Sequence, residues 1–143
     1  MAFVSNILST KPGVTYSITP GQTVYSALEM MVEKNVSALL VMEGDKLAGI
    51  FTERDYARKV MLKGKSSRET TIGDIMTKDV ISVTPETSVE DCMRLMTTKF
   101  IRHLPVLTGD KVAGIISIGD VVKNVIEDQK FIIENMEHYI SGI

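Results

Sequence analysis

The sequence predicts an α+β fold (α/β-like) in which two pseudo-symmetric β-α-β-β-α repeats pack sheet to sheet, followed by a C-terminal helix extension. Three observations predict it. Identical residues recur 65 positions apart along most of the chain, beginning with Thr19-Pro20 and Thr84-Pro85. Within each copy, short runs of branched apolar residues alternate with segments whose apolar residues recur at helical spacing. After the second copy, an apolar stripe of helical period continues toward the C-terminus.

The composition of the 143 residues is typical of a folded protein, with 44% apolar and 24% charged residues. No apolar run approaches the ~18 residues that a membrane-spanning helix needs, so we expect no membrane partner. The net charge of −2 provides no cationic field for nucleic acid, and we expect no nucleic-acid partner. A single cysteine, Cys92, and an N-terminus without the features of a signal peptide favour a cytoplasmic location.

The repeat predicts the organisation of the chain. We expect a first domain at 6–62, a polar linker at 63–71, a second domain at 72–128 and a helical extension at 129–143. Upstream of the ungapped repeat, Asn6–Ser9 is similar to Asp74–Thr77 if the first copy carries three extra residues around Lys11.

The first strand and helix of each copy follow from local sequence. The strands, 14–18 and 80–83, are expected to end at the Thr-Pro pairs because proline disfavours continuation. Thr87 and Glu90 have the spacing of a capping box at the start of the second copy's helix. Apolar residues at helical spacing predict the buried faces of these helices: Val24, Ala27, Leu28 and Met31 in the first copy, and Val89, Cys92, Met93 and Met96 in the second.

A central hairpin and a second helix complete each copy. The strands 38–42 and 47–51 flank a turn, as do 103–107 and 112–116. A unit of roughly 50 residues with helices on one face of its sheet buries too little to be stable alone. We therefore expect the two copies to pack together and to leave clefts where they meet, which is where small-molecule sites are favoured.

The C-terminal segment has one apolar and one charged face. Between 121 and 140 the apolar residues follow helical spacing, interrupted at Gln129. Such a helix needs a partner surface, which its own chain, a second subunit or a regulated target protein could supply. We expect a homodimer contact first.

These motifs identify the family. A tandem β-α-β-β-α pair with Gly49-Ile50-Phe51-Thr52-Glu53-Arg54-Asp55 and Gly114-Ile115-Ile116-Ser117-Ile118-Gly119-Asp120 resembles the pair of CBS (cystathionine β-synthase) domains called a Bateman module. The resemblance runs from about Asn6 to about Val125. It implies a regulatory protein for signal transduction or energy sensing, not an enzyme, that binds AMP, ATP or NAD(H) between its copies and forms a homodimer.

The repeated motif has a chemistry that suits a nucleotide. The hydroxyl of Thr52 or Ser117 lies near a helix N-cap, where free amides favour a phosphate. An ionised Asp55 or Asp120 only accepts hydrogen bonds, and ribose hydroxyls supply two donors. The motif glycines are expected to let backbone approach the ligand. The alternative is that Thr/Ser and Asp form a plain helix cap without a ligand.

Other candidate residues follow from family position. The resemblance implies that Arg102, a phosphate partner, and His103 flank the ligand together with Leu104 and Pro105; the alternative is an exposed corner of the sheet. The first copy has Ser37 and Ala38 there, so its cleft must differ, and Arg54 could compensate. By family position, the segment from Thr77 to Val80 in the second copy and the segment from Ser9 to Thr15 in the first are candidates for the adenine slot. The remaining candidates are basic residues that either neutralise a diphosphate or belong to a solvated linker: Arg58 and Lys59.

Two functions therefore remain open. The first is an adenosine-nucleotide sensor, with AMP and/or NAD(H) as regulatory ligand, which acts on a regulated target protein that the sequence does not identify. The alternative is a ligand-free scaffold for dimerisation or docking, with vestigial clefts. We expect no metal, because Cys92, His103 and His138 form no ligand pair.

Overall fold

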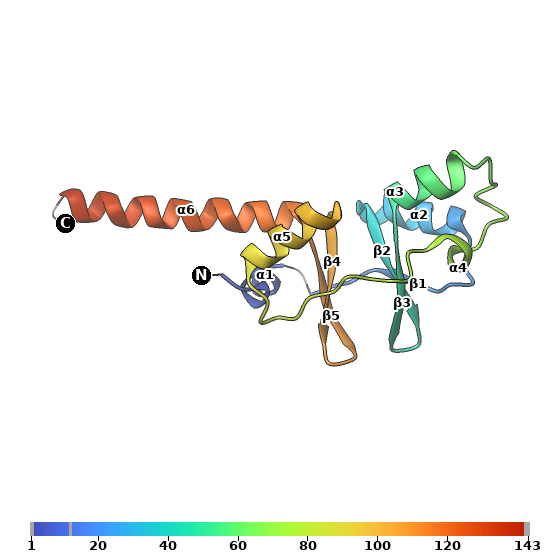
Figure 1. The fold of residues 1–143 in the computed structure, drawn as a ribbon, viewed down its shortest axis with the longest axis horizontal. Helices are drawn as coiled ribbons and strands as arrows, with labels where there is room; N and C mark the ends of the chain where they lie inside the picture. Colours follow the sequence, from blue (N-terminus) through green and yellow to red (C-terminus); the bar gives the residue numbers. More distant parts are fainter. Residues whose placement is uncertain (1, 12, 142–143) are drawn as a thin grey trace.

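The computed structural model describes residues 2–11 and 13–141, and it places two similar lobes side by side, with a long helix that projects from one of them (Figure 1). The elements follow one another in this order: α1 (Val4–Thr10), β1 (Ser17–Ile18), α2 (Val24–Lys34), β2 (Ala38–Glu43), β3 (Lys46–Thr52), α3 (Glu53–Asp55), the π-helix η1 (Tyr56–Met61), α4 (Ile72–Ile75), α5 (Val89–Lys99), β4 (His103–Thr108), β5 (Lys111–Ser117) and α6 (Ile118–Ser141).

The central hairpins agree with the repeat residue by residue. Strands β2 and β3 pair antiparallel, as do β4 and β5, and each pair has a register shift at the same place, after Val41 and after Val106. The turns place Gly44 and Gly109 at φ of 60° and 62°, a left-handed conformation that glycine adopts without steric cost. The predicted hairpins are thereby confirmed.

The first strands are shorter than predicted. Only Ser17–Ile18 of the expected strand 14–18 pairs with β2, in parallel. The expected strand 80–83 is reduced to one parallel bridge between Val83 and Val106. The first sheet therefore has three strands and the second has two. In the second sheet, the segment beside β4 makes too few ladder hydrogen bonds to form a strand.

Helices α2 and α5 bury the predicted faces, but the predicted cap of α5 is wrong by one residue. The N-cap is Ser88, whose hydroxyl accepts from the amide of Asp91, while Thr87 accepts from the amide of Thr84 in the preceding turn. Both helices end in the left-handed conformation, at Asn35 and Phe100. Asparagine tolerates this conformation, whereas it is unusual for a bulky residue such as phenylalanine.

Each repeat contributes a leading helix to the core of the other. Val4 and Ile7 of α1 are buried in the core cluster of the second repeat, together with Leu104 and Val121. In the same way, the apolar residues of α4 are buried in the core cluster of the first repeat. The two halves are therefore joined by an exchange of segments as well as by a shared surface.

The motif glycines lie where the leading segment of the other repeat crosses each hairpin, a contact that was not expected from sequence, while their approach to a ligand stays a prediction. A Cβ on Gly49 would lie 2.7 Å from the carbonyl oxygen of Thr77, and a Cβ on Gly114 would lie 2.8 Å from Cδ2 of Leu8. The missing side chains let the leading segment of the other repeat cross β3 and β5 at van der Waals distance.

A third apolar cluster joins the sheets. Ala38, Leu40 and Ile50 are buried there, and side chains from the second repeat, including Val80 and Ile115, pack against them. The predicted sheet-to-sheet packing and α+β class are thereby confirmed.

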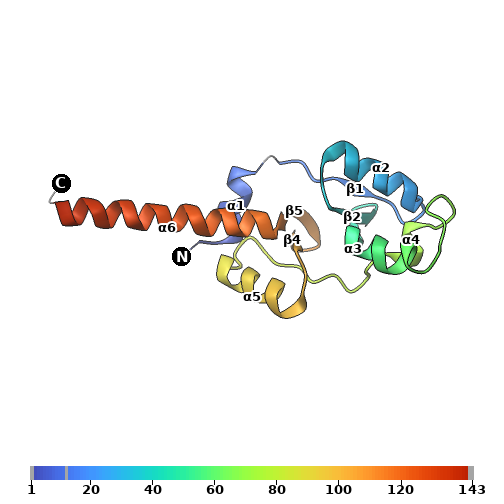
Figure 2. The ribbon, with the colours of Figure 1, turned by 90° about the horizontal axis from the view of Figure 1, so that it is seen from above.

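Helix α6 is anchored only at its start. Val121 is fully buried against the second repeat, but the helix then projects beyond the body of the molecule (Figures 1 and 2). Its later apolar side chains are exposed, Ile132 at 52% and Ile140 at 81%. None of the helices in the described part of the chain is both long and apolar enough to span a bilayer.

Candidate functional site

A cavity of about 680 Å³ lies between the two repeats. Strand β3 and helices α3 and η1 of the first repeat form one wall, and the end of α5 and the start of β4 form the other. Its size is within the usual range for small-molecule sites. It is lined by Ser37, Ile50, Thr52, Glu53, Arg54, Asp55, Arg58, Lys59, Thr77, Lys99, Phe100, Ile101, Arg102 and His103.

Asp55 is the buried carboxylate of this cavity. One oxygen, Oδ2, accepts from the amide and the hydroxyl of Thr52, at 3.0 and 3.1 Å. The other, Oδ1, accepts from the hydroxyl of Thr77 at 3.0 Å and forms an ion pair with Lys59 at 3.1 Å. The Thr52–Asp55 pair is therefore a helix capping box and a wall of the cavity at once. A carboxylate has about four acceptor sites, and all are engaged.

The cavity has a basic lining. Five basic and two acidic side chains face it, although the chain as a whole has a net charge of −2. Arg54 donates to the carbonyl oxygen of Phe100 across the cavity at 2.6 Å. Across the part of the chain that the structure describes, the side chains of Arg58, Lys99 and Arg102 have no hydrogen bond or ion pair. The arrangement can therefore hold an anion.

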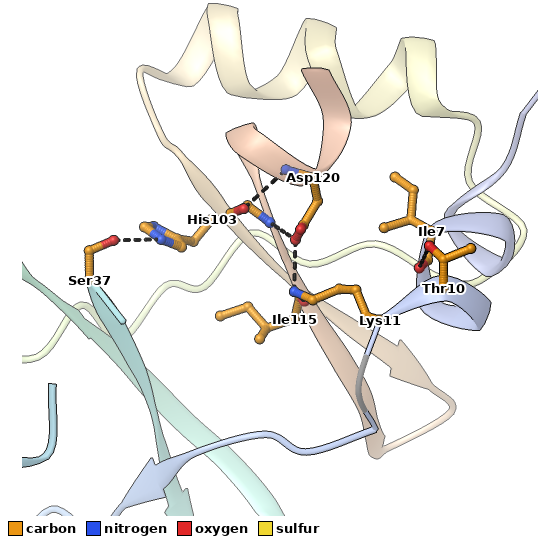
Figure 3. A network of polar contacts seen from close by, with 8 residues as sticks. Ile7, Thr10, Lys11, Ser37, His103, Ile115 and Asp120 are labelled. Atoms are coloured by element: carbon orange, nitrogen blue, oxygen red, sulfur yellow. Dashed lines mark hydrogen bonds and ion pairs between the residues drawn. The ribbon is translucent and has the colours of Figure 1, made fainter. Parts of the chain in front are cut away.

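The second copy of the motif has different partners. Asp120 forms an ion pair of 2.7 Å with Lys11, which also donates to the carbonyl oxygen of Ile115 at 2.8 Å (Figure 3). Burial alone would raise the pKa of Asp120, but hydrogen bonds from Lys11 and from the amide of Ser117 outweigh it and lower the pKa. The carboxylate thus carries a charge that Lys11 already neutralises.

His103 lies between the two copies of the motif. Its Nε2 and the hydroxyl oxygen of Ser37 share a hydrogen bond of 3.1 Å across the seam (Figure 3). Burial lowers the pKa of His103, and the positive charges of Lys11 and Arg102 lower it further, against an opposing effect of Asp120. The ring is therefore neutral near pH 7.

The structure brings seven of the residues predicted from sequence together in the cavity: Ser37, Thr52, Arg54, Asp55, Thr77, Arg102 and His103. The others lie elsewhere. Ala38 and Val80 belong to the apolar cluster between the sheets. Leu104 is fully buried in the second core, and Pro105 is buried in β4. Ser117 and Asp120 cap α6 beside Lys11.

Lys99 and Phe100 were not among the residues predicted from sequence, and Lys11, within the segment 9–15 expected at the adenine slot, was not expected to pair with Asp120. The offset of 65 does place Lys99 over Lys34 and Phe100 over Asn35 at the ends of matched helices, so this signal was available. Lys11 had no such signal, because it lies among the extra residues of the first copy. Arg58 and Lys59 line the cavity, and a role for them in neutralising a diphosphate stays a prediction. No group of three possible metal ligands occurs among the described residues.

Two copies of one α+β unit enclose a polar cavity, which is the arrangement of a tandem regulatory module. The CBS domain family matches residues 4–62 and 72–127, and the chain belongs to this family. It is 46% identical over 129 residues to the mitochondrial CBS domain-containing protein CBSX3 of Arabidopsis thaliana, covering 87% of this chain and spanning 63% of that relative.

Solved structures agree with this assignment. A putative signal-transduction protein with CBS domains from Burkholderia ambifaria MC40-6 superposes with a TM-score of 0.86 at 51% identity, covering 90% of this chain and 96% of that one. The structure of CBSX2 in complex with AMP superposes with a TM-score of 0.76 at 26% identity, covering 90% of this chain and 99% of that one. The tandem arrangement of two CBS domains is therefore shared with these structures.

Proposed function

We propose that this chain binds an adenosine nucleotide (AMP, ATP or NAD(H)) in the cavity between its repeats and acts as a homodimeric regulatory module in signal transduction or energy sensing. The observation that carries the proposal is the cavity itself, which combines Asp55 and Thr52 of one repeat with Arg102 and His103 of the other. The AMP complex of the similar protein CBSX2 supports the ligand class.

The contacts of Asp55 suggest how a ribose would bind. Because its acceptor sites are all engaged, a sugar hydroxyl must replace one donor, and the ion-paired Lys59 is the one on a flexible side chain. The displaced ammonium group would then be free to contact a phosphate. The apolar side chains of Ile50 and Ile101 supply a surface for the base. Ligand binding would thus replace the ion pair between Lys59 and Asp55 with contacts to the ligand. A partner protein can sense this change at η1.

Regulation requires that the ligand bind two conformations unequally. The cavity is formed by both repeats, and Ser37 and His103 meet across their seam, so an occupied cavity favours one relative position of the halves. In this proposal, the regulated target protein recognises that relative position of the two repeats. No catalytic role is proposed, because among the described residues no carboxylate is hydrogen-bonded to His103 to complete a triad with Ser37.

A second copy of the chain is the proposed partner of α6. Helices gain most of their stability from packing of an apolar face, and much of this 24-residue helix has no such packing in its own chain. From Val125, which still packs against the core of the second repeat, the residues Gln129, Ile132 and Met136 follow at spacings of four, three and four, as in the seam of a coiled coil. A copy of the same helix supplies a matching seam.

The location proposed for the protein is the cytoplasm, as the cysteine content suggested. The name of the Arabidopsis relative places that protein in mitochondria, so an organellar location is the alternative.

Thermal unfolding with AMP, ATP and NAD+ tests nucleotide binding. At a hundred times Kd, binding adds about 2.7 kcal/mol of stability, or roughly 5–10 °C in Tm for a chain of this size.

Asp55→Asn, which keeps the shape of the cap, should lose at least tenfold in affinity, whereas Asp45→Asn in the exposed hairpin turn should bind normally. Asp120→Ala should abolish binding in the cleft that the sequence predicts beside Asp120, and it should leave the cavity beside Asp55 and the dimer intact. No shift with any of the three nucleotides would favour the ligand-free scaffold.

A further inference from the structure

We propose that the cavity beside Asp55 selects nucleotides that carry two or more phosphate groups, and that Arg58, Lys99 and Arg102 hold the phosphate chain. This inference rests on the proposed nucleotide binding and names its ligand class. It follows from the cations that have no partner among residues 2–11 and 13–141 rather than from the ribose contact.

The three cations reach the cavity from both repeats. Arg58 lies on η1 of the first repeat, Lys99 on the last turn of α5 and Arg102 just before β4 of the second. All three are exposed. The other two basic residues of the lining are engaged, since Arg54 contacts the carbonyl of Phe100 and Lys59 contacts Asp55. Like charges gathered in one cavity repel each other, and a polyanion between them removes that repulsion.

The number of free cations decides between ligand classes. The three cations outweigh the Glu53 carboxylate of the same lining by two charges. A single terminal phosphate carries about −1.5 to −2 charge but occupies one place, whereas the cations come from both walls of the cavity. Each further phosphate adds negative charge and extends the anion toward the opposite wall. Arginine donates two parallel hydrogen bonds to phosphate, and lysine binds it as a point charge, so the three side chains suit a chain of phosphate oxygens.

The second copy of the motif provides an internal comparison. The repeat places Gly119 over Arg54, Lys123 over Arg58 and Asn124 over Lys59, so two of these three cations are lost. The residues that match Arg102 and His103 are the neutral Ser37 and Ala38. In addition, Lys11 already pairs with Asp120. The basic cavity therefore belongs to one side of the molecule only.

Isothermal titration with AMP, ADP, ATP and NAD+, in EDTA so that no metal bridges the phosphates, tests the inference. We expect ADP and ATP to bind the wild-type protein at least tenfold more tightly than AMP. Arg58→Gln and Lys99→Gln should each weaken ATP about tenfold while changing AMP less than threefold. The matched control is Lys123→Gln, at the position equivalent to Arg58 in the other repeat, and it should change neither affinity.

The outcomes separate the two proposals. If AMP binds as tightly as ADP and ATP, or if Arg58→Gln and Lys99→Gln weaken AMP and ATP equally, the selectivity for a phosphate chain is wrong and nucleotide binding stands. If none of the four nucleotides binds the wild-type protein, both proposals fail. Unliganded Tm values of the variants within a few degrees of wild type exclude misfolding as the cause of a loss, because the substituted side chains are exposed.

Discussion

Asp55 and Asp120 occupy equivalent positions of the two repeats and cap equivalent helices. The residues that they contact outside the capping box are nevertheless different. Asp55 accepts from the hydroxyl of Thr77 and from Lys59, which lies four residues along its own helix. Asp120 pairs with Lys11, a residue 109 positions away that also binds the carbonyl oxygen of Ile115. In the first repeat the equivalent carbonyl, of Ile50, accepts from the backbone amide of Thr77 instead. The same motif thus supports two chemically different sites.

The protonation of His103 should make folding stability depend on pH. Its pKa is lowered below the ordinary value of 6.5 in the folded protein, by burial and by the positive charges of Lys11 and Arg102. Between these two pKa values the unfolded chain binds more protons, so stability is fully present above pH 6.5 and falls as the pH drops below it. One proton allows a slope of at most about 1.4 kcal/mol per pH unit. Urea unfolding at pH 7.5 and 5.5 measures the loss.

One variant separates His103 from the other titrating groups. His103→Gln should flatten the dependence between pH 7.5 and 5.5 that the wild-type protein shows. The lowered pKa of Asp120 acts in a different range, because its contribution is lost only as the pH falls below about 4. An unchanged pH dependence in His103→Gln would show that the ring is not the group responsible.

The candidate site could be predicted from sequence only where its residues belong to a repeated local motif. Thr52 and Asp55 recur as Ser117 and Asp120, and a helix cap needs that spacing whether or not a ligand binds. The contact of Lys11 with Asp120 leaves no local pattern, because it joins residues at opposite ends of the chain.

At the scale of elements, the crossing of β3 and β5 by the leading segments predicts different costs for two matched substitutions. Gly49→Ala places a methyl group against the carbonyl oxygen of Thr77, which is backbone and cannot rotate away. Gly114→Ala meets the end of the Leu8 side chain, which can. Overpacking typically costs 1–3 kcal/mol, so we expect about 3 kcal/mol for the first and about 1 kcal/mol for the second in the free energy of unfolding.

Chemical denaturation of both variants beside Gly21→Ala tests this difference. A Cβ on Gly21 has no atom within 4 Å, so that variant should be as stable as wild type. Equal stability of Gly49→Ala and Gly114→Ala would contradict the close approach of the Thr77 backbone.

Elements with strong local signals were predictable, and those determined by tertiary contacts were not. The hairpins have apolar strands on either side of a Gly-Asp turn, and both copies formed where expected. The strand expected at 80–83 has a similar sequence pattern, but its length depends on how much of β4 is free to pair with it. The cap of α5 was placed at Thr87 rather than Ser88 because adjacent hydroxyl residues offer the same chemistry.

At the scale of the whole molecule, α6 is expected to hold two copies together. Ile132→Glu places a charge in the proposed seam, and the variant should be monomeric at concentrations where the wild-type protein is a dimer. Light scattering coupled to size exclusion measures the mass. Lys130→Glu changes an exposed charge outside the seam and should leave the dimer intact. A dimer that survives Ile132→Glu would place the interface elsewhere on the chain.

The exchanged leading helices bear on how such a protein can be divided. A cut in the linker at 63–71 would leave one fragment with α1 but without the α4 that fills its core, and another with α4 but without α1. Each fragment would expose the groove that the helix of the other fragment fills. We therefore expect each fragment to fold poorly alone and the two fragments to fold together when mixed. The two halves that the duplication produced are interlocked, and neither is expected to be an independently folding domain.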